Sequence, residues 1–424
     1  MDNLIPESQP FISGRGELFC RGCLGIDLFS ALNLGELPIA NELITSPSAN
    51  TETFQLHLRI CNSCGLGQVA DVVTPDRIFT DYRYLSSTST TFLKHASDMV
   101  ENEILSGNVT SKDWVLEIAS NDGYLLKNFL KNGIRAIGIE PAQNVAEISR
   151  SLGIETISEF FSSRLAHEIL LKHGFPKLII ANNVLAHVPD LMDFVKGLSI
   201  LCGPKTRISV ENPSLINILT KMQFDTIYHE HYSYLSAVAI QKIGEVHGLH
   251  LSRIEEIPTH GGSNRYILTK LLSGSNVDSS VATIVQYELA SKLFSQDTWA
   301  TYTQKVNKIL ENFSDWLEYK DELGSKIYGY GAAAKASTLL NSIPSKGKSI
   351  LKIADASSEK QERFMPSHGI QIISPSTLFE SGPTDIIIFP WNIKNEIAEF
   401  LRLNLGAQVH LWCAIPEMHE LEVS

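Results

Sequence analysis

The sequence predicts an α/β protein of three domains, in which a small cysteine-containing unit precedes two Rossmann-like units. The chain has 424 residues, more than the roughly 250–300 residues that a single core usually serves. Short apolar runs alternate with segments of helical spacing, as in a parallel sheet with crossover helices, and this pattern occurs twice. Four of the six cysteines fall in two pairs near the N-terminus. We therefore expect domains at 1–81, 82–291 and 292–424.

The charge balance excludes some classes of partner. Lysine and arginine number 35 against 47 acidic residues, a formal net charge of −12, and there is no basic stripe with interleaved aromatic residues. Nucleic acid and anionic membrane are not expected partners. The N-terminal residues do not resemble a signal peptide, and no apolar run approaches the ~18 residues of a membrane helix. We expect a cytoplasmic protein that is a monomer or a weak homo-oligomer.

The first domain contains the pairs Cys20/Cys23 and Cys61/Cys64. A C-x-x-C turn brings two thiolates to one ion, and two such turns complete a tetrahedral four-sulfur shell. The spacing predicts a structural zinc ion held by all four cysteines. The alternatives are reduced cysteines without a metal and a redox pair.

The second and third domains repeat one order of elements. The predicted strands of the second domain are 114–118, 136–139, 178–181 and 207–210, with helices at 124–130 and 145–152. A stretch without proline or glycine predicts one long connecting helix over 281–323. In the third domain we expect a strand and turn at 326–331, a helix at 332–340, and strands at 350–354 and 385–389.

The first turn of the second domain is a candidate cofactor site. Strand 115–118 leads through Ala119-Ser-Asn-Asp-Gly123 into a helix, and Glu140 ends the next strand, 23 residues after Glu117. An acid at about this offset binds ribose hydroxyls in such folds. The turn lacks the glycines of a dinucleotide site, and Glu117 would repel a pyrophosphate. These features favour S-adenosylmethionine, with its amino-acid tail and sulfonium charge, bound by Glu117, Ser120, Asn121, Gly123 and Glu140.

A cluster of proton-transferring side chains follows, at Tyr228-His229-Glu230-His231. His231 is the predicted general base, since imidazole titrates near neutral pH. Glu230 is expected to orient or activate an imidazole, and Tyr228 to donate to a developing oxyanion or to share the role of base.

Several ordered motifs carry a resemblance to a known family. They are the two C-x-x-C pairs, the Glu-Ile-Ala-Ser-Asn-Asp-Gly turn, Phe-Asp-x-Ile-Tyr-x-Glu-His, His260-Gly-Gly-Ser263 and Gly329-Tyr-Gly-Ala-Ala-Ala-Lys335. The turn is similar to the first motif of class I methyltransferases, from which it departs at Ala119. The whole set resembles the nucleotide-sugar C-methyltransferases, which act at carbon 3 of dTDP-4-keto-deoxyhexoses. That implies a zinc-binding domain, a central class I methyltransferase domain and a C-terminal Rossmann-like domain that helps hold the nucleotide sugar.

The resemblance also implies roles for individual residues. Tyr228, Glu230 and His231 match the family pattern, whereas His229 stands where the pattern varies. Glu159 would reach the adenine amino group and Phe160 or Phe161 would stack on the adenine. The other residues expected near the donor or the reacting carbon are Tyr82, Tyr84, Ser87, Asn182, Asn183 and His187.

By the same resemblance, the third domain is expected to help hold the nucleotide sugar over the donor methyl. A strand-to-helix turn that carries Lys335 suits a phosphate, while Trp391 and Asn392 supply a ring and an amide. The remaining expected substrate residues are His260, Gly261, Gly262, Ser263 and Asp355. The turn at 329–335 is equally consistent with a structural role, and it leaves NAD as an alternative ligand.

Methyl transfer to carbon requires a carbanion equivalent, which a neighbouring ketone provides as an enolate. The expected reaction is therefore deprotonation beside a ketone followed by methyl transfer. The alternatives are methylation of oxygen or of another small keto compound, an NAD-dependent oxidoreductase that uses the third domain, and a zinc-containing interaction protein with inactive enzyme domains.

Overall fold

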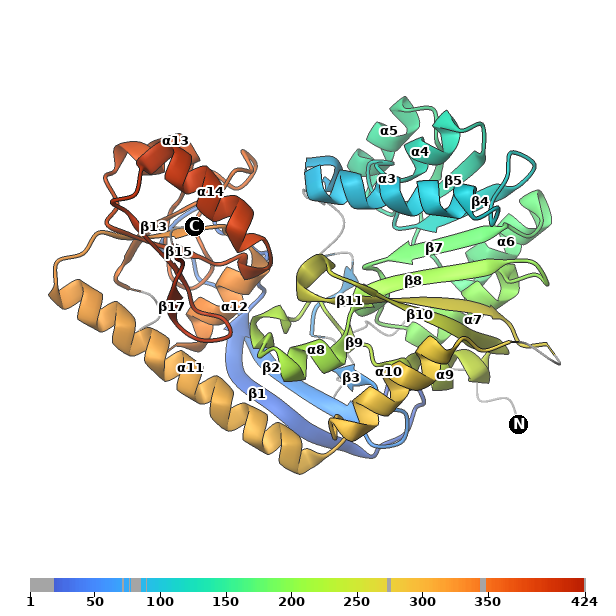
Figure 1. Cartoon of the computed structure of the whole chain (residues 1–424), viewed down its shortest axis with the longest axis horizontal. Helices are drawn as coiled ribbons and strands as arrows, with labels where there is room; N and C mark the ends of the chain where they lie inside the picture. Colours follow the sequence, from blue (N-terminus) through green and yellow to red (C-terminus); the bar gives the residue numbers. More distant parts are fainter. Residues whose placement is uncertain are drawn as a thin grey trace.

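The computed structural model describes residues 19–70, 72–75, 77, 85–88, 90–272, 276–343 and 348–422; for residues 88, 90 and 260 it describes the backbone alone. Three sheets organise this part of the chain (Figure 1). The predicted mixed α/β class is confirmed.

The N-terminal sheet is antiparallel and contains a strand from the second domain. Its order is β1 (Leu28–Pro38), β2 (Thr53–Cys61), β3 (Gly67–Gln68) and β9 (Ser233–Tyr234). Gly67 pairs with Tyr234, and Gln68 pairs with Ser233. The candidate catalytic segment therefore ends as an edge strand of the zinc-binding domain.

The central sheet has seven strands in the order β10-β11-β8-β7-β4-β5-β6. The strands are β4 (Trp114–Ile118), β5 (Arg135–Ile139), β6 (Glu155–Ile157), β7 (Leu178–Asn182), β8 (Arg207–Pro213), β10 (Leu249–Ile257) and β11 (Ser263–Lys270). β11 is antiparallel to β8 and β10, and the other pairings are parallel. The four predicted strands are confirmed. Their continuous apolar runs reflect burial on both faces, as parallel sheets require.

Helices cover the central sheet (Figure 1). They are α3 (Thr90–Leu105), α4 (Leu126–Lys131), α5 (Gln143–Ser151), α6 (Ser163–His173), α7 (Leu191–Leu201) and α9 (Ala237–Val246). The short element η1 (Ser86–Thr88) precedes α3. η2 (Leu185–His187) follows β7, and α8 (Leu215–Thr220) and η3 (Phe224–Thr226) follow β8. In open α/β sheets, ligands bind at the carboxyl ends of the strands.

The C-terminal sheet is again Rossmann-like, with the order β14-β13-β12-β15-β16-β17. The strands are β12 (Ile327–Tyr330), β13 (Ile350–Ala354), β14 (Ile372–Ile373), β15 (Asp385–Ile388), β16 (His410–Cys413) and β17 (His419–Glu420). The helices are α12 (Ala334–Ser342), α13 (Pro375–Glu380) and α14 (Lys394–Leu405). Only the last pairing, β16 with β17, is antiparallel.

The single connecting helix predicted over 281–323 is wrong. Two helices occupy this stretch, α10 (Ser279–Ala290) and α11 (Gln296–Glu322). Lys292 takes a left-handed conformation with φ of 53°, and the Trp299 indole N–H donates to the Leu293 carbonyl at 2.7 Å. A non-glycine residue tolerates this conformation at a cost of about 1–2 kcal/mol, so the break needed neither proline nor glycine. α11 then runs beside β1, where Thr303 donates to the Ala31 carbonyl at 3.1 Å (Figure 1).

Candidate active site and zinc site

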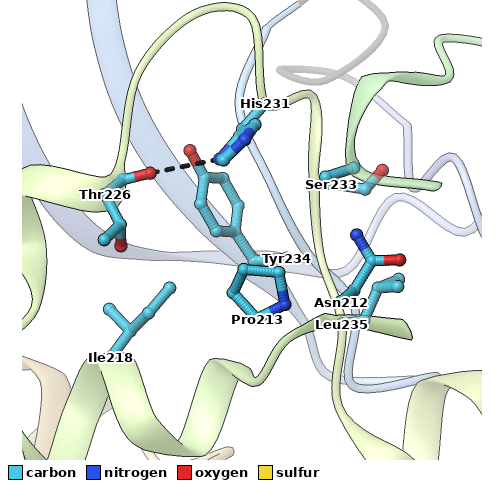
Figure 2. Close-up of a pocket in the computed structure, with 9 residues that line it drawn as sticks. Asn212, Pro213, Ile218, Thr226, His231, Ser233, Tyr234 and Leu235 are labelled. Atoms are coloured by element: carbon cyan, nitrogen blue, oxygen red, sulfur yellow. Dashed lines mark hydrogen bonds between the residues drawn. The ribbon is translucent and has the colours of Figure 1, made fainter. Parts of the chain in front are cut away.

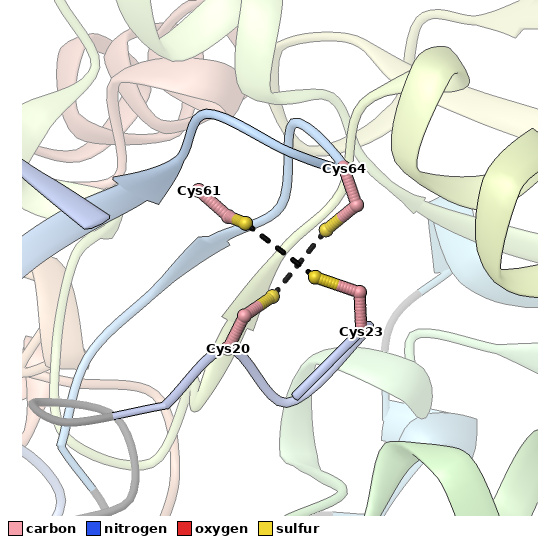
Figure 3. Close-up of side chains that lie close together, drawn as sticks. All are labelled: Cys20, Cys23, Cys61 and Cys64. Atoms are coloured by element: carbon pink, nitrogen blue, oxygen red, sulfur yellow. Dashed lines mark hydrogen bonds between the residues drawn. The ribbon is translucent and has the colours of Figure 1, made fainter. Parts of the chain in front are cut away.

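The four paired cysteines converge on one point (Figure 3). Their sulfurs lie within 4.8 Å of one another, with 3.3 Å between Cys20 and Cys64 and 3.6 Å between Cys23 and Cys61. A tetrahedral zinc ion with bonds of about 2.3 Å places its sulfurs about 3.8 Å apart. The residues fit a closed zinc site. Because four sulfurs leave no position for a substrate, the ion that they hold is structural.

Three residues of the turn after β4 take a left-handed backbone conformation. Ala119, Asn121 and Gly123 have φ angles of 54°, 49° and 78°. A Cβ atom on Gly123 would lie 2.4 Å from the Ile154 side chain. Ala119 therefore departs from the family motif in sequence while it keeps the left-handed backbone that glycine adopts readily.

Buried oxygens without a hydrogen-bond partner among the described residues surround this turn. They belong to Glu117, Ser120, Asp122, Asn182 and Asn183. Such groups are rare in folded proteins unless a ligand or water completes them. Burial, followed by the charges of Asp122 and Glu140, raises the pKa of Glu117 well above its ordinary value. A polar ligand with a positive charge, such as S-adenosylmethionine, would satisfy these groups, so the residues present fit this cofactor.

Glu140 is held at the end of β5 by two backbone amides. Its oxygens accept from Asn121 at 3.0 Å and from Ala142 at 2.9 Å. Burial raises the pKa of Glu140, although the two amides oppose this shift. Each carboxylate oxygen accepts about two hydrogen bonds, so both can still bind ribose hydroxyls.

Other predicted cofactor residues lie around the same edge. The backbone N–H groups of Ser86 and Ser87 donate to Asn121 at 2.9 Å and to Asp122 at 3.3 Å. Tyr82 and Tyr84 lie outside the described residues. Near β6, Glu159 is paired with Arg164, Phe160 is exposed, and Phe161 packs edge-on against Phe194 at 5.0 Å. Of the two aromatic residues, Phe160 is accessible to a ligand and Phe161 packs in the protein.

Tyr228 and His231 form a hydrogen-bonded pair. The Tyr228 hydroxyl lies 2.7 Å from His231 Nε2. His231 Nδ1 lies 3.2 Å from the Thr226 carbonyl (Figure 2). A carbonyl only accepts, so Nδ1 carries the proton and Nε2 accepts from Tyr228. The pair is therefore prepared to move a proton from the phenol to the imidazole.

His187 packs against this pair from the end of β7. Its ring centroid lies 4.7 Å from that of His231, and its Nδ1 donates to the Glu230 carbonyl at 2.7 Å. Burial lowers the pKa of His187 to about 4. At neutral pH the His187 ring is uncharged, so it does not compete with His231 for a proton.

The side chains of His229 and Glu230 point toward the N-terminal domain. Glu230 accepts from Asn41 through the backbone N–H at 2.9 Å and the side-chain amide at 3.1 Å. His229 Nε2 lies 3.0 Å from the Phe54 carbonyl. Burial raises the pKa of Glu230 and lowers that of His229 to about 4. Glu230 thus reaches an imidazole through its main-chain carbonyl, while its carboxylate fixes the segment to residue 41.

The same segment contacts the C-terminal domain through Asp225. Its carboxylate accepts from the Trp391 indole at 2.7 Å, and the Lys335 ammonium lies 3.9 Å from the centre of the Trp391 ring. Lys335 also donates to Asn392 at 2.7 Å. Burial raises the pKa of Asp225 to about 6 and lowers that of Lys335 to about 8. Lys335, Trp391 and Asn392 therefore meet at one place.

The Gly-Gly turn lies against this cluster. A Cβ atom on Gly261, whose φ is 88°, would lie 2.3 Å from Trp391, and one on Gly262 would lie 2.5 Å from Asn217. The Gly261 carbonyl accepts from Gln223 at 2.8 Å. Ser263 is buried and donates to the Thr259 carbonyl at 3.3 Å. Gly261 is needed because Trp391 of the C-terminal domain approaches its backbone, whereas Gly262 is crowded by Asn217 and Lys221 of the central domain.

Asp355 lies at the glycine-rich turn after β12 and is already bonded within its own domain. It accepts from the Ala332 N–H at 2.8 Å, the Ser357 N–H at 2.9 Å and the Lys360 ammonium at 3.3 Å. A dinucleotide would need this carboxylate for its ribose. The two amide contacts of Asp355 repeat those of Glu140 and leave acceptor positions for a ribose, and the Lys360 ammonium is the added contact.

Three family models match successive parts of the chain. They are described as "Putative zinc binding domain" at residues 20–79, "Methyltransferase domain" at residues 93–253 and "C-methyltransferase C-terminal domain" at residues 258–416. The C-methyltransferase NovU of Streptomyces niveus is 29% identical over 382 residues, which cover 90% of this chain and 91% of that protein. These matches support an S-adenosylmethionine-dependent C-methyltransferase.

Solved methyltransferases also resemble part of this C-methyltransferase. The magnesium protoporphyrin IX methyltransferase ChlM of Synechocystis, with bound SAH, is 14% identical and covers 42% of this chain and 83% of its own, with a TM-score of 0.33. CcbJ of Streptomyces caelestis is 11% identical and covers 41% and 89%, with a TM-score of 0.31. The predicted zinc and S-adenosylmethionine agree with the family and with the residues described above. No helix in the described ranges is long and apolar enough to cross a membrane.

Sequence reasoning missed several residues of this C-methyltransferase site. Asp225 stands inside the recognised motif but was given no role. Asn212 and Ser233 line a cavity beside His231, and their buried side-chain polar atoms have no partner in the described part of the chain (Figure 2). Asn212 follows the predicted strand 207–210, and a polar residue at the carboxyl end of such a strand could have indicated a site residue. Ser233 is brought to the cavity by the pairing of β9 with β3, which no local pattern indicates.

Proposed function

We propose that this C-methyltransferase transfers a methyl group from S-adenosylmethionine to a carbon beside the ketone of a nucleotide-linked keto sugar, carbon 3 of a dTDP-4-keto-deoxyhexose. The observation that carries the proposal is the position of one short segment. Its Tyr228–His231 pair lies beside His187 at the edge of the methyltransferase sheet, and its Asp225 contacts the Lys335–Trp391 cluster. A substrate that spans these two clusters has a reacting group at one end and an anionic group at the other.

The residues of the first cluster generate the nucleophile. The proton on the carbon passes to the Tyr228 oxygen as the Tyr228 proton passes to His231 Nε2, and the electron pair of the C–H bond moves to the ketone oxygen. The imidazolium keeps its Nδ1–H on the Thr226 carbonyl. The buried Asn212 amide, which has no partner among the described residues, is available to donate to the enolate oxygen. Glu117 and Glu140 would hold S-adenosylmethionine, whose S–CH3 bond would break as the carbon takes the methyl group, leaving S-adenosylhomocysteine.

The second cluster recognises the nucleotide. The Lys335 ammonium suits a diphosphate, and the Trp391 ring offers a face for a base or a sugar. Gly261 lets the backbone of the central domain approach Trp391.

A substrate panel tests the proposal. The purified protein would be mixed with S-adenosylmethionine and several dTDP-4-keto sugars, and the products followed by mass spectrometry and by NMR of the new methyl group. We expect a methyl group on carbon, and its loss in His231→Asn and Tyr228→Phe variants that still bind S-adenosylmethionine by calorimetry. A methyl group on oxygen would support the alternative reaction, and full activity in both variants would refute the assigned chemistry.

A further inference from the structure

The first C-x-x-C turn, Cys20–Cys23, is the first zinc knuckle. It contacts the candidate catalytic segment, residues 228–232, through one buried side chain. Arg21 stands between the zinc ligands Cys20 and Cys23 and is 4% exposed. Its Nη1 donates to the Val69 carbonyl at 2.6 Å and to the Tyr232 carbonyl at 3.0 Å. Tyr232 is the residue directly after His231. The zinc-binding turn is therefore one hydrogen bond from the backbone of the proton-transferring pair.

Further contacts fix both ends of this connection. The backbone N–H of Arg21 donates to the Gln68 side chain at 2.8 Å, and the Arg21 guanidinium lies 5.4 Å from the centre of the Tyr232 ring. The Tyr232 carbonyl also accepts from the Val69 N–H at 3.1 Å. The Tyr232 hydroxyl donates to the Val73 carbonyl at 2.7 Å. Both acceptor positions of the Tyr232 carbonyl are thus used.

The geometry points to Arg21 as a positioning residue, which transmits the shape of the zinc knuckle to the Tyr228–His231 pair. Metal bonds to Cys20 and Cys23 fix the backbone on both sides of Arg21, so its side chain starts from a rigid turn. The proposal rests on the proposed catalytic role of the pair. It gives the zinc-binding domain a part in catalysis beyond its own folding, although Arg21 does not touch the reacting atoms.

The contacts of the residue 21 side chain explain why this residue is an arginine. Two carbonyls accept from one guanidinium that lies against an aromatic ring, an arrangement that lysine reproduces only in part. An apolar side chain of similar length would leave the Tyr232 carbonyl with one partner. Because a displacement of about 1 Å at a reacting group costs up to ~10²-fold in rate, a small movement of residues 228–232 has a measurable effect.

Lys242 provides a matched control. Its ammonium donates to the Ser63 carbonyl at 2.5 Å, so it binds the second zinc knuckle as Arg21 binds near the first. It reaches that knuckle from α9 and is exposed. Lys242→Met removes a cation from a knuckle without a contact to residues 228–232, whereas Arg21→Met removes the contact itself.

The test compares Arg21→Met, Arg21→Lys and Lys242→Met in zinc-loaded full-length protein. Zinc content, the Kd for S-adenosylmethionine, kcat and the titration of the His231 imidazole by NMR would be measured, with the resonance assigned from His231→Asn. For Arg21→Met we expect one zinc per chain, an unchanged Kd, kcat lower by about tenfold to a hundredfold and a shifted His231 titration. Arg21→Lys should recover part of kcat, and Lys242→Met should match the wild type.

Two results would overturn the proposal: an unchanged His231 titration and kcat in Arg21→Met, or equal changes in Lys242→Met. If Arg21→Met does not fold, Arg21→Lys decides, since the proposal requires a shifted His231 titration at full zinc content in that variant. The NMR measurement separates this proposal from the proposed function. An active His231→Asn enzyme would refute the catalytic role, while the His231 resonance in the Arg21 variants would still report the contact.

Discussion

The Tyr228–His231 pair predicts that two substitutions are strongly non-additive. Tyr228→Phe removes the hydroxyl that donates to His231 Nε2 at 2.7 Å, and His231→Gln removes the imidazole that accepts this proton. If the two side chains act as one proton-accepting unit, each single change disables the same step. The double variant then loses little more than the worse single variant.

The expected magnitude follows from the role of the pair. A positioned general base contributes about 10²–10⁴ in rate, which corresponds to about 2.7–5.4 kcal/mol of transition-state free energy. Two independent groups of this strength would together contribute ~10⁴–10⁸. For a single unit we expect the double variant to lie within about threefold of the slower single variant.

The assay is the kcat of methyl transfer at saturating substrate, with the Kd for S-adenosylmethionine measured by calorimetry to show that the donor site is intact. Tyr266→Phe is a suitable control, because it removes a buried hydroxyl from β11 without a contact to the pair. A double-variant loss equal to the product of the single losses would refute the shared role. So would a Tyr228→Phe enzyme with wild-type kcat.

Three further predictions concern pH, stability and metal. Burial lowers the pKa of Lys335 to about 8, so the ammonium charge is lost as pH rises through that value. The KM for the nucleotide sugar should therefore increase above about pH 8, and should increase less in Lys335→Arg. A KM that does not change with pH would contradict the phosphate role. Burial raises the pKa of Glu288 from 4.5 to about 7. Because the folded pKa exceeds the unfolded one, the free energy of unfolding should fall by roughly 3 kcal/mol as pH rises from about 4.5 to 7. Urea unfolding of Glu288→Gln should not show this decrease with pH. Cys61→Ser should lower the zinc content and the free energy of unfolding by several kcal/mol; a variant with wild-type stability and no zinc would contradict a structural ion.

Local patterns predicted most of the fold. Apolar runs such as 114–118 and 178–181 were recognisable because strands buried on both faces are continuously hydrophobic. The four cysteines could be assigned because the C-x-x-C spacing itself determines which thiols meet. The break at Lys292 was missed because a left-handed lysine leaves no signal of the kind that glycine or proline gives.

Long-range contacts could not be predicted in the same way. The pairing of Gln68 with Ser233 joins residues far apart in sequence, and nothing local to either strand specifies its partner. The direction of the Glu230 side chain depends on that pairing, so its contact with Asn41 was not foreseen. The cluster of Asp225 with Lys335 likewise depends on how two domains pack.

The central claim is that the Tyr228–His231 pair removes a proton from carbon so that the carbon can be methylated. The most direct test is deuterium incorporation from D2O into a dTDP-4-keto-deoxyhexose, followed by NMR in the presence of protein without S-adenosylmethionine. We predict enzyme-dependent exchange at carbon 3, slowed by about 10²-fold or more in Tyr228→Phe and His231→Gln, and methylation at the same carbon when the donor is added. Carbon methylation at the wild-type rate in these two variants, with exchange unaffected, would contradict the account.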